Sequence, residues 1–197
     1  MKKIHWILLV SIYVLLHSCT KVNRYYIKDV DKEMIPYQLG DTVCFFDDKG
    51  NPVTLAVTSI EDKWFIEDDA FSEQWDQVRI VDLRSEISDW GLKLQAMGGS
   101  KNYRVMNILL RPSGLIMSIA YDLAGDFLHL PEGSYSKQYA YDSLSIGSKM
   151  YHDVVESYSW NYVNPGVVPD TTRCCYSKTY GVLQVKSGGK TLLQWCP

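Results

Sequence analysis

The sequence is poor in histidine, the side chain that most often moves protons at neutral pH. It has four histidines in 197 residues, and two of them, His5 and His17, lie within the first 18 positions. His129 and His152 occur in runs typical of β-strands, and neither lies near the G-x-S-x-G pattern of a hydrolase nucleophile. This scarcity limits the acid–base chemistry that the chain can perform.

The paired C-x-x-C spacing of zinc sites and of thioredoxin-type redox sites is also missing. Cys174 and Cys175 are adjacent, so on a strand their side chains point to opposite faces and do not readily share one metal. The acidic residues between positions 61 and 69 lack the spacing of a calcium-binding loop. We therefore expect no metal and no cofactor.

Positive charge is not in excess either. The chain has 20 Lys and Arg against 23 Asp and Glu, a net charge of −3. Binding to nucleic-acid phosphates requires a basic patch, and no cluster of basic residues stands out in the sequence. We expect no nucleic-acid partner.

No apolar run is long enough for a permanent membrane-spanning helix, which needs about 20 residues. The longest run, residues 7–16, follows Lys2 and Lys3 and has the length of the apolar part of a secretory signal. It ends at Leu16-His17-Ser18-Cys19, which resembles the lipobox of bacterial lipoproteins: an aliphatic residue three before the cysteine and a small residue just before it.

This resemblance implies that residues 1–18 are a signal peptide and that Cys19 becomes the lipidated first residue of the mature protein. The implied partner is the membrane, reached through palmitate-type acyl chains, and the implied location is the cell envelope, at the outer membrane. Several acyl chains hold a protein stably where one does not. Because no acidic run follows Cys19 directly, the periplasmic and surface sides both stay open. The mature chain keeps 18 basic residues against 23 acidic ones, a net of −5.

Short runs of β-branched and aromatic residues, separated by Gly, Pro, Ser and Asn, make up most of the remaining sequence. They predict a mainly β fold: an antiparallel meander of about ten strands that forms a sandwich, a barrel or a curved open sheet, with few short helices. The strands are expected at 42–46, 53–58, 77–83, 90–96, 103–110, 115–121, 139–146, 149–160, 172–178, 181–186 and 191–195, and the helices at 70–77 and 83–90.

The polar segment 19–38 has no sustained period, so we interpret it as a lipidated tether ahead of one β domain, residues 39–197. The stretch 61–76 interrupts the β pattern, and a sub-boundary is expected there. GDTVCFFDDKGNPVTLAV (40–57) and YSKTYGVLQVKSGGKTLLQW (176–195) resemble parts of small β-rich envelope lipoproteins of unknown function from gut-type Gram-negative anaerobes. That resemblance implies a lipid-anchored β domain and carries no active-site residues.

Export makes disulfides chemically feasible for the four cysteines after Cys19. If residues 187–189 turn a hairpin, Cys196 lies opposite Gly181, and Cys174 is ~23 Å further along that strand at ~3.3 Å per residue. A disulfide needs ~4–7 Å between Cα atoms. We therefore expect Cys44 to pair with Cys174 or Cys175, with buried free thiols as the alternative.

Aromatic residues mark the two longest irregular stretches, 61–75 and 161–173. Trp64, Trp75, Trp160 and Tyr162 lie in or beside them and are expected to line a shared ligand-binding surface, unless they point inward as packing anchors. The expected function is a non-enzymatic binding module for a glycan, peptide or partner protein. A hydrolase of the cell envelope and a lipid-handling half-barrel are the alternatives.

Overall fold

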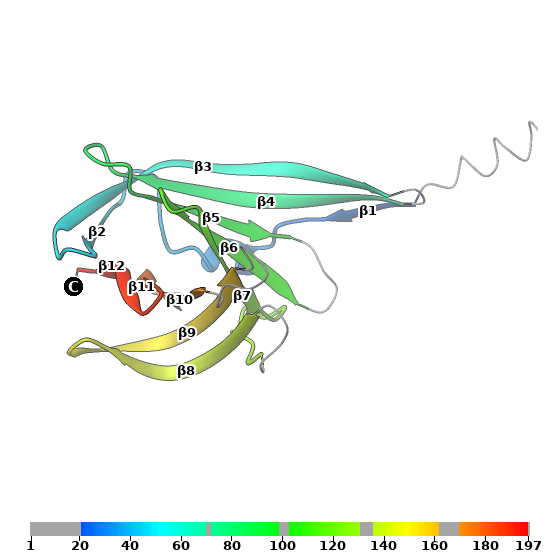
Figure 1. Cartoon of the computed structure of the whole chain (residues 1–197). Helices are drawn as coiled ribbons and strands as arrows, with labels where there is room; N and C mark the ends of the chain where they lie inside the picture. The colour runs from blue at the N-terminus through cyan, green and yellow to red at the C-terminus, as the bar shows by residue number, and fades with distance from the viewer. Residues whose placement is uncertain (1–20, 70–71, 99–102, 131–135, 162–169, 197) are drawn as a thin grey trace, which may run out of the picture.

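Eleven antiparallel strands follow one another around a nearly closed barrel, which confirms the mainly β meander (Figure 1). The structure is a computed structural model, and it describes residues 21–69, 72–98, 103–130, 136–161 and 170–196. The ring consists of β2 (Thr42–Asp47), β3 (Pro52–Asp69), β4 (Ser72–Arg84), β5 (Gly91–Met97), β6 (Arg104–Arg111), β7 (Leu115–Tyr121), β8 (Ser136–Ile146), β9 (Lys149–Asn161), β10 (Asp170–Ser177), β11 (Gly181–Ser187) and β12 (Lys190–Trp195). Outside it are β1 (Lys21–Tyr25), parallel to β4, and helix α2 (Asp29–Glu33).

The strands form where the period-two pattern predicts them, because alternate side chains enter one core. In β6, for example, Met106, Ile108 and Leu110 are fully buried while the residues between them are partly exposed. The two predicted helices are wrong. Residues 72–84 form β4 and residues 85–90 form the turn into β5, while α2 is the one helix in the part of the chain that the structure describes.

The ring is open between its two end strands, β7 and β8, and this opening is here called the seam. Every neighbouring pair in the order β7-β6-β5-β4-β3-β2-β12-β11-β10-β9-β8 is antiparallel, so the two end strands run in the same direction. The connection between them fills the gap: Phe127 bridges Tyr121, and Leu130 bridges Gln138. The Gln138 amide accepts from the Ala120 N–H at 2.8 Å and donates to the Ala120 carbonyl at 2.7 Å. A side chain therefore supplies hydrogen bonds that a strand ladder would otherwise make.

Residues 27–37, here called the plug, run from β1 into the barrel. Met34, Ile35 and Tyr37 are 1%, 5% and 7% exposed and belong to the main hydrophobic core. Figure 1 shows α2 in the interior between β5 and β10. The interior is a packed core and is not an open cavity.

Buried polar contacts attach the plug to the strands on both sides of the seam. Asp31, fully buried, forms an ion pair with Arg104 of β6 and accepts a hydrogen bond from the Tyr121 hydroxyl of β7 at 3.0 Å. On the other side, the Tyr176 hydroxyl donates to the Met34 carbonyl, and the Val182 N–H donates to the Tyr37 hydroxyl at 2.9 Å. Buried polar groups that are paired in this way select one position for the segment that carries them.

These contacts correct the predicted domain boundaries. Residues 21–38 are not a tether, because they supply a strand and part of the core. The sequence concealed this because the exposed Lys28, Asp29 and Lys32 alternate irregularly with the buried residues. No sub-boundary is seen at 61–76 among the described residues, which belong to the continuous hairpin β3–β4.

The disulfide joins Cys44 to Cys196, so the predicted pairing of Cys44 with Cys174 or Cys175 is wrong. β12 pairs with β2, with Trp195 opposite Phe45, and the next residue, Cys196, donates its N–H to the Cys44 carbonyl at 2.9 Å. The prediction failed because this pairing spans 152 residues and leaves no local signal. Cys174 and Cys175 are free and buried, on opposite faces of β10.

Gly181 tests the packing of the plug. A Cβ there would overlap the Tyr37 ring and hydroxyl, and its φ is +74°. We expect Gly181→Ala to lower the free energy of unfolding by about 3 kcal/mol or more, measured by urea denaturation. Gly50→Ala is the matched control: its φ is +80° but nothing lies within 4 Å, so it should cost only about 1 kcal/mol. Equal losses would contradict the close contact with Tyr37.

Peptide mapping without reduction should recover Cys44 joined to Cys196. Burial raises the pKa of Cys175 to about 11 and that of Cys174 well above its usual value, so both thiols should resist alkylation until the protein unfolds. Reduction of the disulfide should lower the free energy of unfolding by about 2–4 kcal/mol. Recovery of a peptide that links Cys44 to the doublet would contradict the register of β2 and β12.

Candidate functional site

A three-stranded ribbon projects from the barrel at the end opposite β2 and the C-terminus (Figure 1). This ribbon, here called the arm, consists of β1 with residues 64–69 of β3 and 72–77 of β4. It forms because β3 continues beyond the residues that pair with β2, and because β5 covers β4 only from Val78 onward. The described residues of 61–75, which were predicted to form an irregular stretch, are therefore regular strand.

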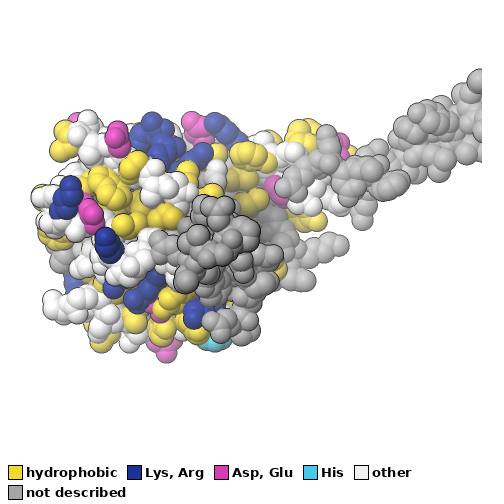
Figure 2. Space-filling view, in the orientation of Figure 1, with side chains coloured by type: hydrophobic (Ala, Val, Ile, Leu, Met, Phe, Trp, Pro, Cys, Tyr) yellow, Lys and Arg dark blue, Asp and Glu magenta, His cyan; other side chains and the backbone are white. Residues whose placement is uncertain are grey.

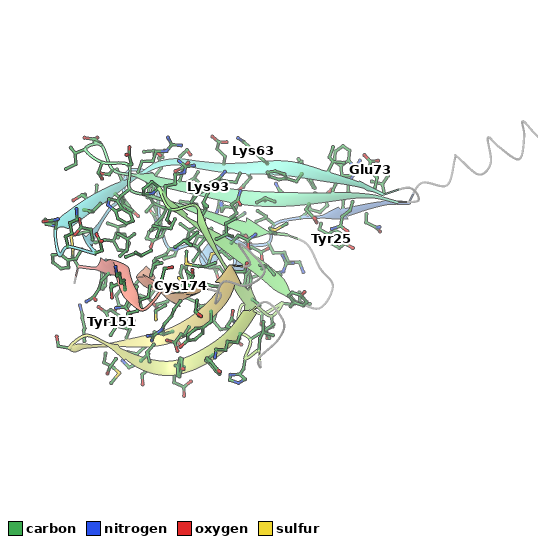
Figure 3. The ribbon with its side chains drawn as sticks, viewed as in Figure 1. Tyr25, Lys63, Glu73, Lys93, Tyr151 and Cys174 are labelled. Carbon is green, nitrogen blue, oxygen red and sulfur yellow. A yellow bond between two sulfur atoms is a disulfide. The ribbon has the colours of Figure 1, made fainter. Side chains whose placement is uncertain are left out.

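Aromatic side chains gather on one face of the arm. The Trp64 and Trp75 rings meet edge to face with centroids 6.1 Å apart, and Tyr26 contacts Trp64 at 5.2 Å. Arg24 places its guanidinium carbon 5.2 Å from the centre of the Trp75 ring, a cation–π contact. In this view, Figure 2 shows hydrophobic side chains alternating with charged ones along the upper side, over β3 and β4. Figure 3 places Tyr25 and Glu73 on the arm and Cys174 in the barrel interior.

At the base of the arm lies a pocket of about 290 Å³, here called the basic pocket. Its lining comes from the end of β1, the start of the plug and the rim of the barrel: Arg24, Tyr25, Tyr26, Lys28, Gly98, Arg104 and Leu123. Gly98 lets the chain come close, because a Cβ there would lie 2.8 Å from the Tyr26 carbonyl carbon. The Ile27 N–H, next along the chain, donates to the Gln77 side chain at 3.1 Å.

The charge in the basic pocket is positive. Arg24 and Lys28 are exposed, whereas Arg104 is 3% exposed and its charge is balanced by Asp31. The Nε of Arg104 is buried without a hydrogen-bond partner within the described ranges. Burial and the negative charge of Asp31 raise the pKa of Tyr121, so this hydroxyl stays protonated and donates to the carboxylate. The pocket therefore offers two exposed cations and two tyrosine side chains to an anionic ligand.

The structure brings together half of the predicted aromatic site. Trp64 and Trp75 are in contact, and Trp64 is 39% exposed, so it is not an inward packing anchor. Trp160 lies in β9 opposite Thr171, but its side chain and all of Tyr162 are outside the described residues, and their part in a shared surface stays a prediction. Cys19 also lies outside them.

Sequence reasoning missed Arg24, Lys28 and Arg104. The first two were assigned to a tether, because the polar segment that carries them has no sustained period of apolar residues. Arg104 gave no signal, because a single arginine at the start of a strand reveals neither its burial nor its pairing with Asp31.

The histidines do not form the cleft that the hydrolase alternative requires. His129 and His152 are both exposed. His129 packs on Tyr139 with ring centroids 5.2 Å apart, and His152 lies in the β8–β9 hairpin opposite Ser143. The residues described here therefore place neither histidine beside a serine and a carboxylate in a pocket.

A second pocket, of about 390 Å³, lies at the seam. Its lining combines apolar side chains with Gln138, Ser118 and Ser157. The polar groups already have partners: Gln138 bonds Ala120 and Leu128, the Ser157 hydroxyl donates to the Ser118 carbonyl at 2.6 Å, and the Ser118 hydroxyl donates to Asn107 at 2.8 Å. They close the seam, and so the basic pocket is the stronger candidate. The lipid-handling alternative calls for an apolar concave face, but the barrel interior is filled by core and plug.

Within the described part of the chain, no group of three or more His, Cys, Asp or Glu side chains is arranged to hold a metal ion. The same residues contain no helix that is long and apolar enough to cross a bilayer.

Comparison of the chain with protein-family models, with curated proteins and with solved structures finds no match.

Proposed function

We propose that this protein is a lipid-anchored envelope protein that acts as a non-enzymatic binding module, and that its ligand is a carbohydrate carrying negative charge. The observation that carries the proposal is the basic pocket. Arg24 and Lys28 converge there with Tyr25 and Tyr26 on a chain whose overall charge is negative. A local positive site on an acidic protein selects for anions and repels cations.

The chemistry of the site suits an acidic sugar. The planar guanidinium of Arg24 can bind a carboxylate or sulfate through two parallel hydrogen bonds, and Lys28 adds a mobile point charge. The aromatic rings offer flat apolar faces with few rotors to immobilise, against which the C–H face of a sugar ring packs. The volume of about 290 Å³ lies at the small end of ligand pockets. It accommodates one sugar residue, with the rest of the chain on Tyr26, Trp64 and Trp75.

The disulfide supports the proposed location. Disulfides persist in oxidising compartments such as the bacterial periplasm and the cell surface, and are rare in the cytosol. The Cys44–Cys196 bond therefore agrees with the export signal of residues 1–18 and with Cys19 as the site of lipid attachment.

Cys19→Ala tests the anchor. In a Gram-negative host, the parent chain should incorporate labelled palmitate and fractionate with outer membrane. The variant should take up no label, because it lacks the thiol that receives the lipid. Incorporation of palmitate into Cys19→Ala would refute the assignment.

Lys28→Ala and Arg24→Ala test the pocket. Calorimetry should show that the parent binds chondroitin sulfate oligosaccharides and not neutral dextran, with an affinity that falls as salt rises. Each substitution should weaken binding about tenfold, because each removes a hydrogen bond to a charged group.

The control for these variants is Lys49→Ala, which removes an exposed lysine from the turn between β2 and β3. It makes the same change of charge far from the pocket and should leave the affinity unchanged. Equal binding of dextran, or full affinity in Lys28→Ala, would contradict the proposal.

A further inference from the structure

The arm exposes apolar side chains on both of its faces. Phe65 is 47% exposed and Ile66 is 51% exposed, and as consecutive residues of one strand they point to opposite faces. Val22 and Trp64, on the Ile66 face, are 45% and 39% exposed. A ligand on the Ile66 face would cover three of these four side chains and leave Phe65 exposed. A medium that surrounds the ribbon would cover them all.

The start of β1 lies close in sequence to Cys19, the proposed site of lipid attachment, and so indicates that this medium is a lipid bilayer. Lys21, its first residue, is paired with Ser72 at the outer end of the β3–β4 hairpin. Cys19 precedes Lys21 by two residues, a span of at most ~7 Å. A lipid on Cys19 therefore enters the bilayer beside the outer end of the arm. This step depends on the lipidation of Cys19 in the proposed function.

We propose that the outer part of the arm contacts the interfacial region of the bilayer that holds the lipid anchor. Phe65 and Ile66 lie three to four residues before Asp69, the last residue of β3, or about 10–13 Å at ~3.3 Å per residue. This distance is greater than the ~5–10 Å to which interfacial segments bury their apolar side chains, so the two side chains reach that depth when the ribbon is inclined toward the bilayer surface.

The charge of the arm determines which lipids it meets. Lys21 and Arg24 supply two positive charges, while Glu67, Asp68, Asp69, Glu73 and Asp76 supply five negative ones. A polybasic segment is attracted to anionic lipids, and this segment has no excess of basic residues. Apolar contact is therefore the driving force, and the arm binds zwitterionic bilayers without dependence on salt.

Vesicle flotation of residues 19–197 carrying Cys19→Ser tests the arm without its lipid. This chain contains every element of the described fold. It should float with phosphatidylcholine vesicles in low and high salt, and phosphatidylglycerol should not increase the bound fraction. Replacing Phe65 and Ile66 together by serine should lower the apparent affinity about tenfold or more.

Ile87→Ser is the matched control, because Ile87 is 91% exposed in the turn between β4 and β5. It should float like the parent. The Phe65/Ile66 variant should keep the parent's melting temperature, because both side chains are about half exposed. Failure of the parent to float, or an equal loss in Ile87→Ser, would overturn the proposal.

The result separates this proposal from the proposed function. If the parent takes up palmitate at Cys19 but the Cys19→Ser chain does not float, the proposed anchor stands and the proposed arm contact is refuted. If the Cys19→Ser chain floats but the parent takes up no palmitate, the proposed arm contact stands and the proposed anchor is refuted. Binding of the acidic oligosaccharide depends on Arg24 and Lys28, and the Phe65/Ile66 variant leaves both in place.

Discussion

The burial of the Asp31 carboxylate is the constraint on which the rest of this structure depends. A carboxylate that leaves water requires charged or hydrogen-bonding partners, and removing one partner of a buried ion pair costs about 3–5 kcal/mol. Its partners come from three places: the Lys28 N–H at 2.7 Å, Arg104 of β6 and Tyr121 of β7. Because all three partners can reach the Asp31 carboxylate in one position only, the plug has a single position in the barrel. In that position Met34 and Tyr37 lie against β10 and β11, and Lys28 lies at the basic pocket.

The strands could be predicted from the sequence because their signal is local. A period of two places Met106, Ile108 and Leu110 on one face whatever the rest of the chain does. The plug could not, since its position follows from partners that are distant in sequence: Arg104 is 73 residues from Asp31, and Val182 is 145 residues from Tyr37. The closure of the ring through β2 and β12 could not be predicted, for the same reason. Nothing near Cys44 indicates that β12 will pair with β2.

The site was predicted in part, for a reason that was only partly right. Trp64 and Trp75 were chosen as loop aromatics, yet they meet because they lie on paired strands, where Ile66 is opposite Trp75 and Trp64 is opposite Gln77. A pair of tryptophans on a ribbon, one exposed and one half-buried, is rigid, which favours binding at low entropic cost. The cations beside them were missed, because charge in a polar N-terminal segment looks the same whether that segment is a linker or the wall of a pocket.

The pairing of β2 with β12 also determines when folding can be completed. In the export that we propose, the chain crosses the inner membrane from its N-terminus, so Cys44 emerges early and the doublet Cys174–Cys175 arrives before Cys196. During that interval the wrong partners for Cys44 are present and the right one is not. The native packing of the core disfavours such a wrong disulfide. The side chain of Cys174 packs inside the barrel and that of Cys175 on its outer face, and both are fully buried. A disulfide from either of them to Cys44 therefore blocks the native packing. Such a chain stays open to thiol exchange until β12 arrives and, by pairing with β2, brings Cys196 to Cys44.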